Sequence, residues 1–359
     1  MILPRFLKPA KPVRRAAAAI IVSLLVLLGS RPSAQGLTSS LFERYLDSLR
    51  LQAGIPGLSA LILQDGVIAW ERGFGRADIE RNIEPSAFTA YQIGGLSQTM
   101  GAALFFKKCV DQRGATTNDP VSIWHSLYPD HSATVGQLLA HVAPGGTYKY
   151  DLARFAALTT VIESCSGIPY QRLIAEEIFS WLSLEDSVPG TALGAPTLED
   201  VQLFGVNNLA RYSVMLNRAA RSYRVDARGR AVRTEVPLSR VNAATGVVTT
   251  ARDLARFDAA LRYNAFVSPQ SVAQAWSPAG VGLPTGLGWF VQSYNGYPVV
   301  WSFGVVPEAY SALLIKLPTR GLTMILLANS DALGAQGALE KGDVMASVFA
   351  RTFLRTYVP

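Results

Sequence analysis

The first part of the chain shows a helical hydrophobic pattern and then a strand pattern. Over residues 39–53, apolar side chains recur at the three- and four-residue spacing of one helix face, and Gly54 follows as a stop signal. Two apolar runs come next, at residues 57–63 and 67–70, and an Asp-Gly pair lies between them. Such runs around Asp-Gly are the strongest short-range signal for a β-hairpin. The pattern therefore predicts a helix followed by a hairpin.

The middle of the chain has the pattern of helices. Apolar-faced segments run over residues 96–112, 152–164 and 171–182. A further helix start is indicated where a threonine cap at 249–250 precedes Asp253, because threonine oxygens cap helices and acidic residues favour the first turn. These segments predict a mostly helical block.

Strand patterns return near the end of the chain. Apolar runs lie at residues 297–302, 310–317 and 322–328, and a helical pattern near residues 344–353 follows them. Strands from the two ends of the chain can join one antiparallel sheet. We therefore expect the α+β fold class, with an antiparallel sheet flanked by terminal helices plus a mostly helical subdomain.

The first 34 residues have the pattern of an export signal. Basic residues precede the apolar run Ala16–Leu28, and Pro32-Ser33-Ala34 offers a cleavage point before Gln35. That run has 13 residues, which is short for a hydrocarbon core of about 30 Å. We expect an exported protein, periplasmic or secreted. An uncleaved anchor is the alternative, and only then would a membrane be a partner.

The remaining residues, 35–359, are expected to form a single unit. No long low-complexity linker and no fixed-period repeat divides them. The sheet lobe is expected at about 35–90 and 240–359, and the helical lobe at about 91–239.

The charge balance gives no reason to expect nucleic acid as a partner. The whole chain is formally +7, but its first 34 residues carry six basic residues and no acidic one, which leaves 27 basic residues against 26 acidic ones. One stretch has six arginines between positions 218 and 233 and lacks helical facing. We expect a solvated loop there, with contact to acidic cell-wall or lipid groups as the minority alternative.

Cysteines and histidines are few. An oxidising compartment would permit a disulfide between Cys109 and Cys165, but both lie in apolar helical segments, so two buried thiols are the expectation. The histidines, His125, His131 and His141, are scattered, and no cluster has metal-ligand spacing. We expect no metal and no cofactor.

Several short segments occur in a characteristic order and spacing: Ile55–Ala60, Tyr91–Gly94, Gly114 to Val121, Leu138–His141, Ser166-Gly167, Gly246–Leu254, Gly286–Trp289 and Leu326–Asn329. Together they resemble the serine β-lactamase-related family, which includes class C β-lactamases, penicillin-binding proteins, D-alanyl-D-alanine carboxypeptidases and esterases. The resemblance covers roughly residues 40–356 and implies the same fold. It also implies that His141, which follows a Leu-Leu pair, is a buried structural histidine.

The resemblance implies three clusters of catalytic residues. In Ser-x-x-Lys at a helix start, the spacing puts hydroxyl and amine on one helix face, so that the lysine can help deprotonate the serine. The others are Tyr-x-Asn (or Ser-x-Asn) on a loop and Lys/His-x-Gly on an edge strand. The equivalent positions in this chain are Gly95, Gln98, Tyr150, Leu152, Ser302 and Gly304.

Each cluster lacks a residue that the chemistry needs. Gly95 has no nucleophile, and Gln98 cannot take a proton at neutral pH. Leu152 stands where the family has asparagine, and Ser302 where it has a basic residue. No Ser-x-x-Lys, Lys-Thr-Gly or Gly-x-Ser-x-Gly occurs elsewhere in the chain. The chain is therefore interpreted as a degenerate family member without acyl-serine catalysis.

Some side chains and amides are candidates for a surviving pocket. They are Ser97, Tyr150, Ser302, Gly304 and Val305. Ser97 is expected to point away from the pocket, because neighbouring helix positions lie about 100° apart. Tyr150 is either a hydrogen-bonding wall or a structural tyrosine, since its aligned neighbours are neutral. The amides of Gly95 and Val305 can form an oxyanion-binding pair, unless Gly304 serves only close packing.

Two functions follow from these positions. The first is a non-catalytic protein that uses the old cleft to bind a peptide, a cell-wall fragment or a protein partner. The alternative is an active serine hydrolase, of esterase or peptidase type, whose site has been rearranged around Ser97, Tyr150 or Ser302.

Overall fold

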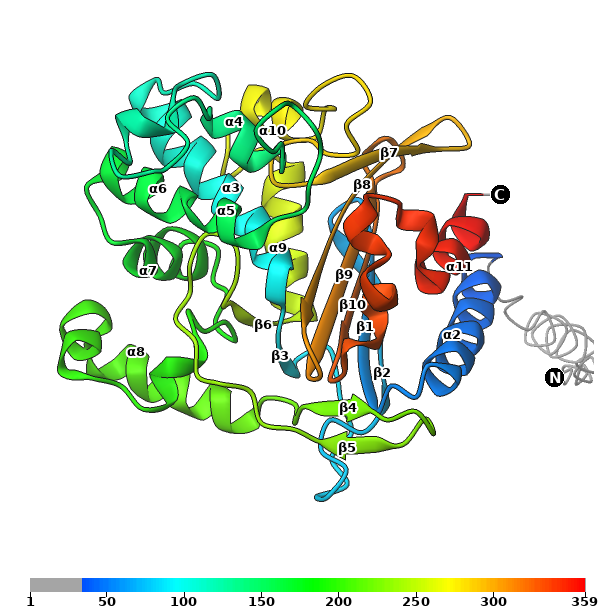
Figure 1. Ribbon diagram of the computed structural model, residues 1–359. Helices are drawn as coiled ribbons and strands as arrows, with labels where there is room; N and C mark the ends of the chain where they lie inside the picture. Colours follow the sequence, from blue (N-terminus) through cyan, green and yellow to red (C-terminus); the bar gives the residue numbers. More distant parts are fainter. Residues whose placement is uncertain (1–33, 359) are drawn as a thin grey trace, which may run out of the picture.

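The computed structural model describes residues 34–358, and its centre is a six-stranded antiparallel sheet built from both ends of the chain (Figure 1). The strands lie in the order β2-β1-β10-β9-β8-β7. They are β1 (Gly57–Gln64), β2 (Val67–Gly75), β7 (Phe290–Tyr294), β8 (Tyr297–Val306), β9 (Tyr310–Leu317) and β10 (Leu322–Ala328). Strand β1 pairs with β10, with Leu58 opposite Ala328. The prediction that the N-terminal hairpin and the C-terminal strands share one sheet is confirmed.

The turn between β1 and β2 explains why the hairpin forms where it does. Asp65 and Gly66 have φ angles of 49° and 70°. Tight hairpin turns need two successive residues with positive φ, and Asp-Gly is among the pairs that adopt this conformation at least cost. The sequence pattern therefore predicted the position of this hairpin, whereas the register shift between Ile62 and Leu63 was not predicted.

Both faces of the sheet are covered, because successive side chains on a strand point to opposite sides. On β10, Leu326 packs in the cluster formed with the terminal helices α2 (Ala34–Gln52) and α11 (Val348–Tyr357), whereas Leu327 packs in the cluster formed with the helical lobe. Figure 1 shows α2 and α11 together on one face and the helical lobe on the other. Layering of this kind buries every residue of β10.

The helical lobe contains the predicted helices, but several are divided. The α-helices within the predicted bounds of this lobe are α3 (Gln98–Phe105), α4 (Val135–Leu139), α5 (Leu152–Ala156), α6 (Leu158–Ser166), α7 (Tyr170–Leu173) and α8 (Leu198–Arg218). Two more helices, α9 (Ala251–Arg262) and α10 (Pro269–Ala275), lie beyond residue 239, in the part of the chain that was assigned to the sheet lobe. The segment predicted over 96–112 becomes a 3₁₀ turn, α3 and a π-helical stretch (Phe106–Asp111), and the one over 152–164 breaks at Ala157. Thr250 caps α9 by accepting a hydrogen bond from the Asp253 amide, as predicted.

Helix α8 was not predicted from the sequence. Apolar and polar residues are mixed along it, and Gly205 has a φ of 74°, which kinks the helix. Because a kink changes which side chains share a face, no single apolar stripe runs along the segment. The helix lies along the lower edge of the helical lobe in Figure 1, next to the hairpin of β4 (Tyr223–Val225) and β5 (Ala231–Arg233).

Two sequence expectations are wrong. Cys109 and Cys165 form a disulfide, with Cα atoms 5.7 Å apart, rather than two thiols. Helix α6 and the π-helical stretch carry them on apolar faces that pack into one core, which brings both residues within disulfide range. The arginine-rich stretch is not a simple loop, because it spans the end of α8 and the β4–β5 hairpin, with Tyr223 opposite Arg233.

The predicted export signal, apart from Ala34, lies outside the described residues. Within residues 34–358, none of the helices is both long enough and apolar enough to cross a membrane.

Candidate functional site

Gly95 and Gln98, which the resemblance aligns with the family's serine and lysine, lie where a strand leads into a helix. Strand β3 (Ala90–Gln92) pairs with β6 (Val248–Thr250) and runs into the 3₁₀ turn η1 (Gly94–Ser97), after which α3 begins at Gln98. Gly94 has a φ of 49°, and a Cβ on it would lie 2.7 Å from the Val305 carbonyl oxygen. A glycine is therefore required before Gly95, which sits at the start of the helix as the resemblance implied.

A chain of hydrogen bonds ties Gln98 to the tyrosine of the second cluster. The Asp151 amide donates to His141 Nδ1 (3.1 Å), so the imidazole proton lies on Nε2, which donates to Gln98 Oε1 (2.5 Å). The Gln98 amide group then donates to the Tyr150 hydroxyl (3.1 Å) and to the Gly95 carbonyl (2.8 Å). The network fixes both the histidine tautomer and the orientation of the glutamine amide.

His141 takes part in this network as a neutral ring. Burial lowers its pKa to about 4, and the neighbouring Asp151 opposes the shift only in part. The ring also stacks on Phe155, with centroids 5.3 Å apart. Both ring nitrogens are occupied within the protein, as expected of a structural histidine.

The Tyr150 hydroxyl occupies the space that a side chain at position 95 would need. A Cβ built on Gly95 would clash with the Tyr150 hydroxyl and lie 3.3 Å from both Gln98 Nε2 and Leu152 Cδ2. The tyrosine ring is held by Phe303, with centroids 5.2 Å apart. Burial raises the pKa of Tyr150 far above its usual range, the Gln98 hydrogen bond opposing it, so the phenol keeps its proton at neutral pH.

Strand β8 closes the other side of this region. Trp301 and Phe303 pack toward the terminal helices, so Ser302 and Gly304 face the helical lobe. A Cβ on Gly304 would collide with the Ile93 carbonyl and lie 2.8 Å from the Gly95 amide nitrogen. The strand therefore touches η1 directly, because glycine lacks the side chain that would hold the two backbones apart.

The remaining candidates lie close by but differ in their surroundings. Ser97 is fully buried, donates to the Gly94 carbonyl (2.8 Å) and accepts from the Val247 amide (3.3 Å). Its hydroxyl thus bonds backbone groups rather than Tyr150. Val305 is half-buried, and its amide nitrogen would lie 2.8 Å from a Cβ on Gly94. An oxyanion-binding role for the Gly95 and Val305 amides stays a prediction.

Sequence reasoning missed two contributors to this site. Leu152 was identified only as a lost asparagine, whereas its side chain closes over Gly95. Asp151 was not singled out, although it caps α5 and its amide fixes the His141 tautomer. An aspartate directly before a helical segment is a cap signal, and this could have been used. No group of His, Cys, Asp and Glu side chains in the described part of the chain could hold a metal ion.

The groups that meet around Gly95 are all neutral: a backbone without a side chain, a carboxamide, a protonated phenol and a neutral imidazole. Such groups can donate and accept hydrogen bonds. At neutral pH the Tyr150 phenol keeps its proton, and both the Gln98 amide and the His141 imidazole are already hydrogen-bonded to protein atoms.

The two lobes, the sheet order and the placement of these positions define the architecture of β-lactamases and penicillin-binding proteins. The chain belongs to the β-lactamase family, whose model matches residues 39–341. It is 22% identical over 283 residues to a Bacillus subtilis (strain 168) protein named as the penicillin-binding protein PbpX, a match that covers 69% of this chain. The match covers 66% of that relative, just under two thirds of its length.

Solved structures share the fold. The octameric penicillin-binding protein homologue from Pyrococcus abyssi has a TM-score of 0.68 and 20% identity, covering 82% of this chain and 74% of that one. The D-alanine carboxypeptidase AmpC from Burkholderia cenocepacia has a TM-score of 0.67 and 17% identity, covering 88% of this chain and 99% of that one. At such identities the likeness concerns the fold alone.

Proposed function

We propose that this chain is a non-catalytic member of the β-lactamase family that binds a peptide, a cell-wall fragment or a protein partner at the former active site. One observation carries the proposal: the Tyr150 hydroxyl fills the place of the nucleophile's side chain beside Gly95. A site that had lost only its serine would leave a gap there. Here neighbouring residues have closed it.

Gln98 supports the same conclusion. A lysine at this position would serve as a base. The glutamine oxygen instead accepts a hydrogen bond from His141, and its amide group donates to Tyr150 and to the Gly95 carbonyl. Its side chain is bound at both ends, and a carboxamide is too weakly basic to take a proton from a nucleophile at neutral pH. The residue therefore serves to hold Tyr150 in place.

Tyr150 supplies the binding chemistry in this proposal. The Tyr150 oxygen accepts a hydrogen bond from Gln98, and no described residue accepts a hydrogen bond from the Tyr150 hydroxyl. A protonated phenol that is half-exposed can donate to a carbonyl or carboxylate oxygen of a ligand. Peptides and cell-wall fragments carry such oxygens.

Export is part of the proposal. Disulfides persist in oxidising compartments and are rare in the cytosol, so the Cys109–Cys165 bond agrees with the basic and apolar pattern of the first 34 residues. N-terminal sequencing of the mature protein is expected to begin at or near Gln35. A chain that retains Met1 and stays in the cytosol would contradict export.

Covalent labelling tests the loss of catalysis. Purified protein is incubated with a fluorescent penicillin and with a fluorophosphonate, and adducts are sought by intact-mass measurement. We expect none, because Gly95 carries no hydroxyl and the Ser97 hydroxyl is enclosed. Labelling that disappears in Ser97→Ala or Ser302→Ala would instead establish the alternative, an active hydrolase with a rearranged site.

A further inference from the structure

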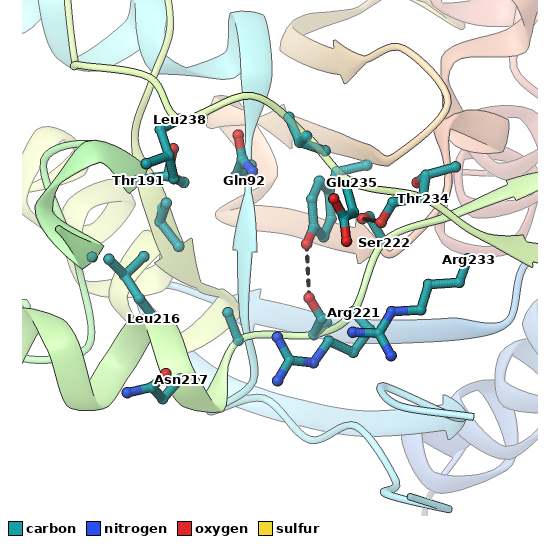
Figure 2. A pocket seen from close by; sticks show the side chains of 16 residues that line it. Gln92, Thr191, Leu216, Asn217, Arg221, Ser222, Arg233, Thr234, Glu235 and Leu238 are labelled. Atoms are coloured by element: carbon teal, nitrogen blue, oxygen red, sulfur yellow. Dashed lines mark hydrogen bonds between the residues drawn. The ribbon is translucent and has the colours of Figure 1, made fainter. Parts of the chain in front are cut away.

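A second pocket lies between the C-terminal end of α8, strand β3 and the segment that follows the β4–β5 hairpin (Figure 2). Its volume is about 370 Å³, which falls within the range of small-molecule sites. None of the family-equivalent catalytic positions lines it. Ligand binding in this pocket would therefore not depend on the function proposed above for the region around Gly95.

Charged side chains without strong partners line this pocket. Arg233 and Glu235 form no ion pair within residues 34–358, and both are exposed. Arg221 is half-buried, and its Nε lies 3.6 Å from Asp78, a long contact that leaves its terminal nitrogens uncommitted. The pocket thus offers cationic groups and one carboxylate to a ligand, and a guanidinium is the side chain best suited to a carboxylate.

The side of the pocket opposite these charges is apolar. Figure 2 shows Leu216 and Leu238 on one side of the pocket and Glu235 on the other. Leu238 is 64% exposed, which is a large apolar surface to leave in water. Val248 is buried and lines the same pocket. A ligand that covered these side chains would gain from burying apolar surface.

The walls are held by internal hydrogen bonds. The Tyr310 hydroxyl donates to the Ala220 carbonyl (2.8 Å), and the Ser222 hydroxyl donates to the Thr234 carbonyl (2.8 Å), which anchors the segment after β5. Gln92 differs from them, because its half-buried amide makes no side-chain hydrogen bond within the described chain. The Gln92 amide can therefore donate and accept hydrogen bonds to a ligand, while the hydrogen bonds in the walls keep the pocket in shape.

We infer that this pocket binds a short zwitterionic peptide with an apolar side chain. Its terminal carboxylate lies against Arg221 and Arg233, its ammonium group against Glu235, and its apolar side chain against Leu216 and Leu238. A ligand with several negative charges fits less well, because Glu235 repels it. A purely apolar ligand would leave the charged groups unpaired.

Calorimetric titration with leucyl-leucine tests the inference. The controls are N-acetyl-leucyl-leucine, which lacks the ammonium group, and leucyl-leucinamide, which lacks the carboxylate. We expect leucyl-leucine to bind best, and Arg233→Gln and Glu235→Gln each to weaken it about fivefold, the usual effect of losing one exposed charge contact. Glu235→Gln should leave the affinity for the acetylated peptide unchanged. Arg228→Gln, which changes an exposed arginine in the β4–β5 turn outside the pocket, should change nothing.

Three results would overturn the inference: no binding of leucyl-leucine at millimolar concentration, equal affinity for the three peptides, or equal effects of Arg233→Gln and Arg228→Gln. Arg233 and Glu235 are both exposed, so the circular dichroism spectra of their variants should match that of the wild type. Labelling by penicillin or fluorophosphonate does not bear on this result, since the pocket shares no lining residue with the former active site.

Discussion

The region around Gly95 and the pocket beside α8 treat their polar groups in opposite ways. Around Gly95, each polar atom of Gln98 and His141 bonds a neighbour within the protein. In the pocket, Gln92, Arg233 and Glu235 form no hydrogen bond or ion pair through their side chains in the described chain. Buried polar groups need hydrogen-bond partners within the protein, whereas groups that water reaches can bond water until a ligand replaces it. Gln98 and His141 therefore hold Tyr150 in position beside Gly95, whereas the pocket beside α8 leaves several polar side chains without a protein partner in the described chain.

The largest expected effect comes from restoring a lysine. In Gln98→Lys an ammonium group would replace the buried carboxamide and face the Nε2 proton of His141, without a counter-charge. We expect a loss of about 3 kcal/mol or more in the free energy of unfolding, measured by urea denaturation. Gln92→Lys is the matched control, and its effect should stay within about 0.5 kcal/mol because the Gln92 side chain is half-buried and makes no hydrogen bond to the described residues. Equal losses would remove the contrast between the two regions.

Acid should weaken the Gly95 region specifically. Burial holds the pKa of His141 at about 4, whereas an unfolded histidine takes up its proton near the ordinary value of 6.5. The contribution of neutral His141 is therefore complete above about pH 6.5 and is lost as the pH falls toward 4, with a total on the order of 3 kcal/mol.

The measurement compares wild type with His141→Asn across this pH range. Asparagine suits the left-handed backbone at this position, where φ is 54°. The stability difference should shrink as the pH falls. Burial also raises the pKa of Asp253, to about 6, which strengthens folding in acid, but this contribution is common to both proteins and cancels. A difference that stays constant with pH would mean that His141 is not held neutral.

A methyl group at position 95 should destabilise the protein because of Tyr150. In Gly95→Ala the added Cβ clashes with the tyrosine hydroxyl, so we expect a loss of about 1–3 kcal/mol. Removing the hydroxyl in Gly95→Ala/Tyr150→Phe should recover part of it, which a double-mutant cycle measures. Gly194→Ala is the control, because its Cβ would meet only Leu216, at 3.6 Å. Additive effects of the two changes would show that Tyr150 does not fill this space.

The smallest expected effect lies in the pocket. Arg233→Gln should change the free energy of unfolding by less than about 0.5 kcal/mol, since this exposed side chain forms no ion pair with any residue in 34–358. Thermal denaturation without peptide measures this. A large loss of stability would place Arg233 among the structural residues, and the two regions would then no longer differ.

Local signals in the sequence predicted those parts of the fold that depend on neighbouring residues. Asp65-Gly66 fixed the hairpin because its backbone preference is local, and Thr250 marked the start of α9 for the same reason. Helix α8 escaped prediction because Gly205 interrupts its pattern, and the joining of β1 to β10 was supported by the family resemblance rather than by periodicity. The disulfide was missed because only packing decides which helical faces meet.

The same division holds for the site. The absence of a nucleophile at Gly95 and of a base at Gln98 could be read from the sequence, because functional groups are set by residue identity. Only the tertiary structure decided that Tyr150 fills the vacated space and that Gln98 is bound at both ends, since these contacts join residues more than 40 positions apart. Residue type determines which chemistry a position can perform, whereas long-range packing determines which group occupies the space beside it.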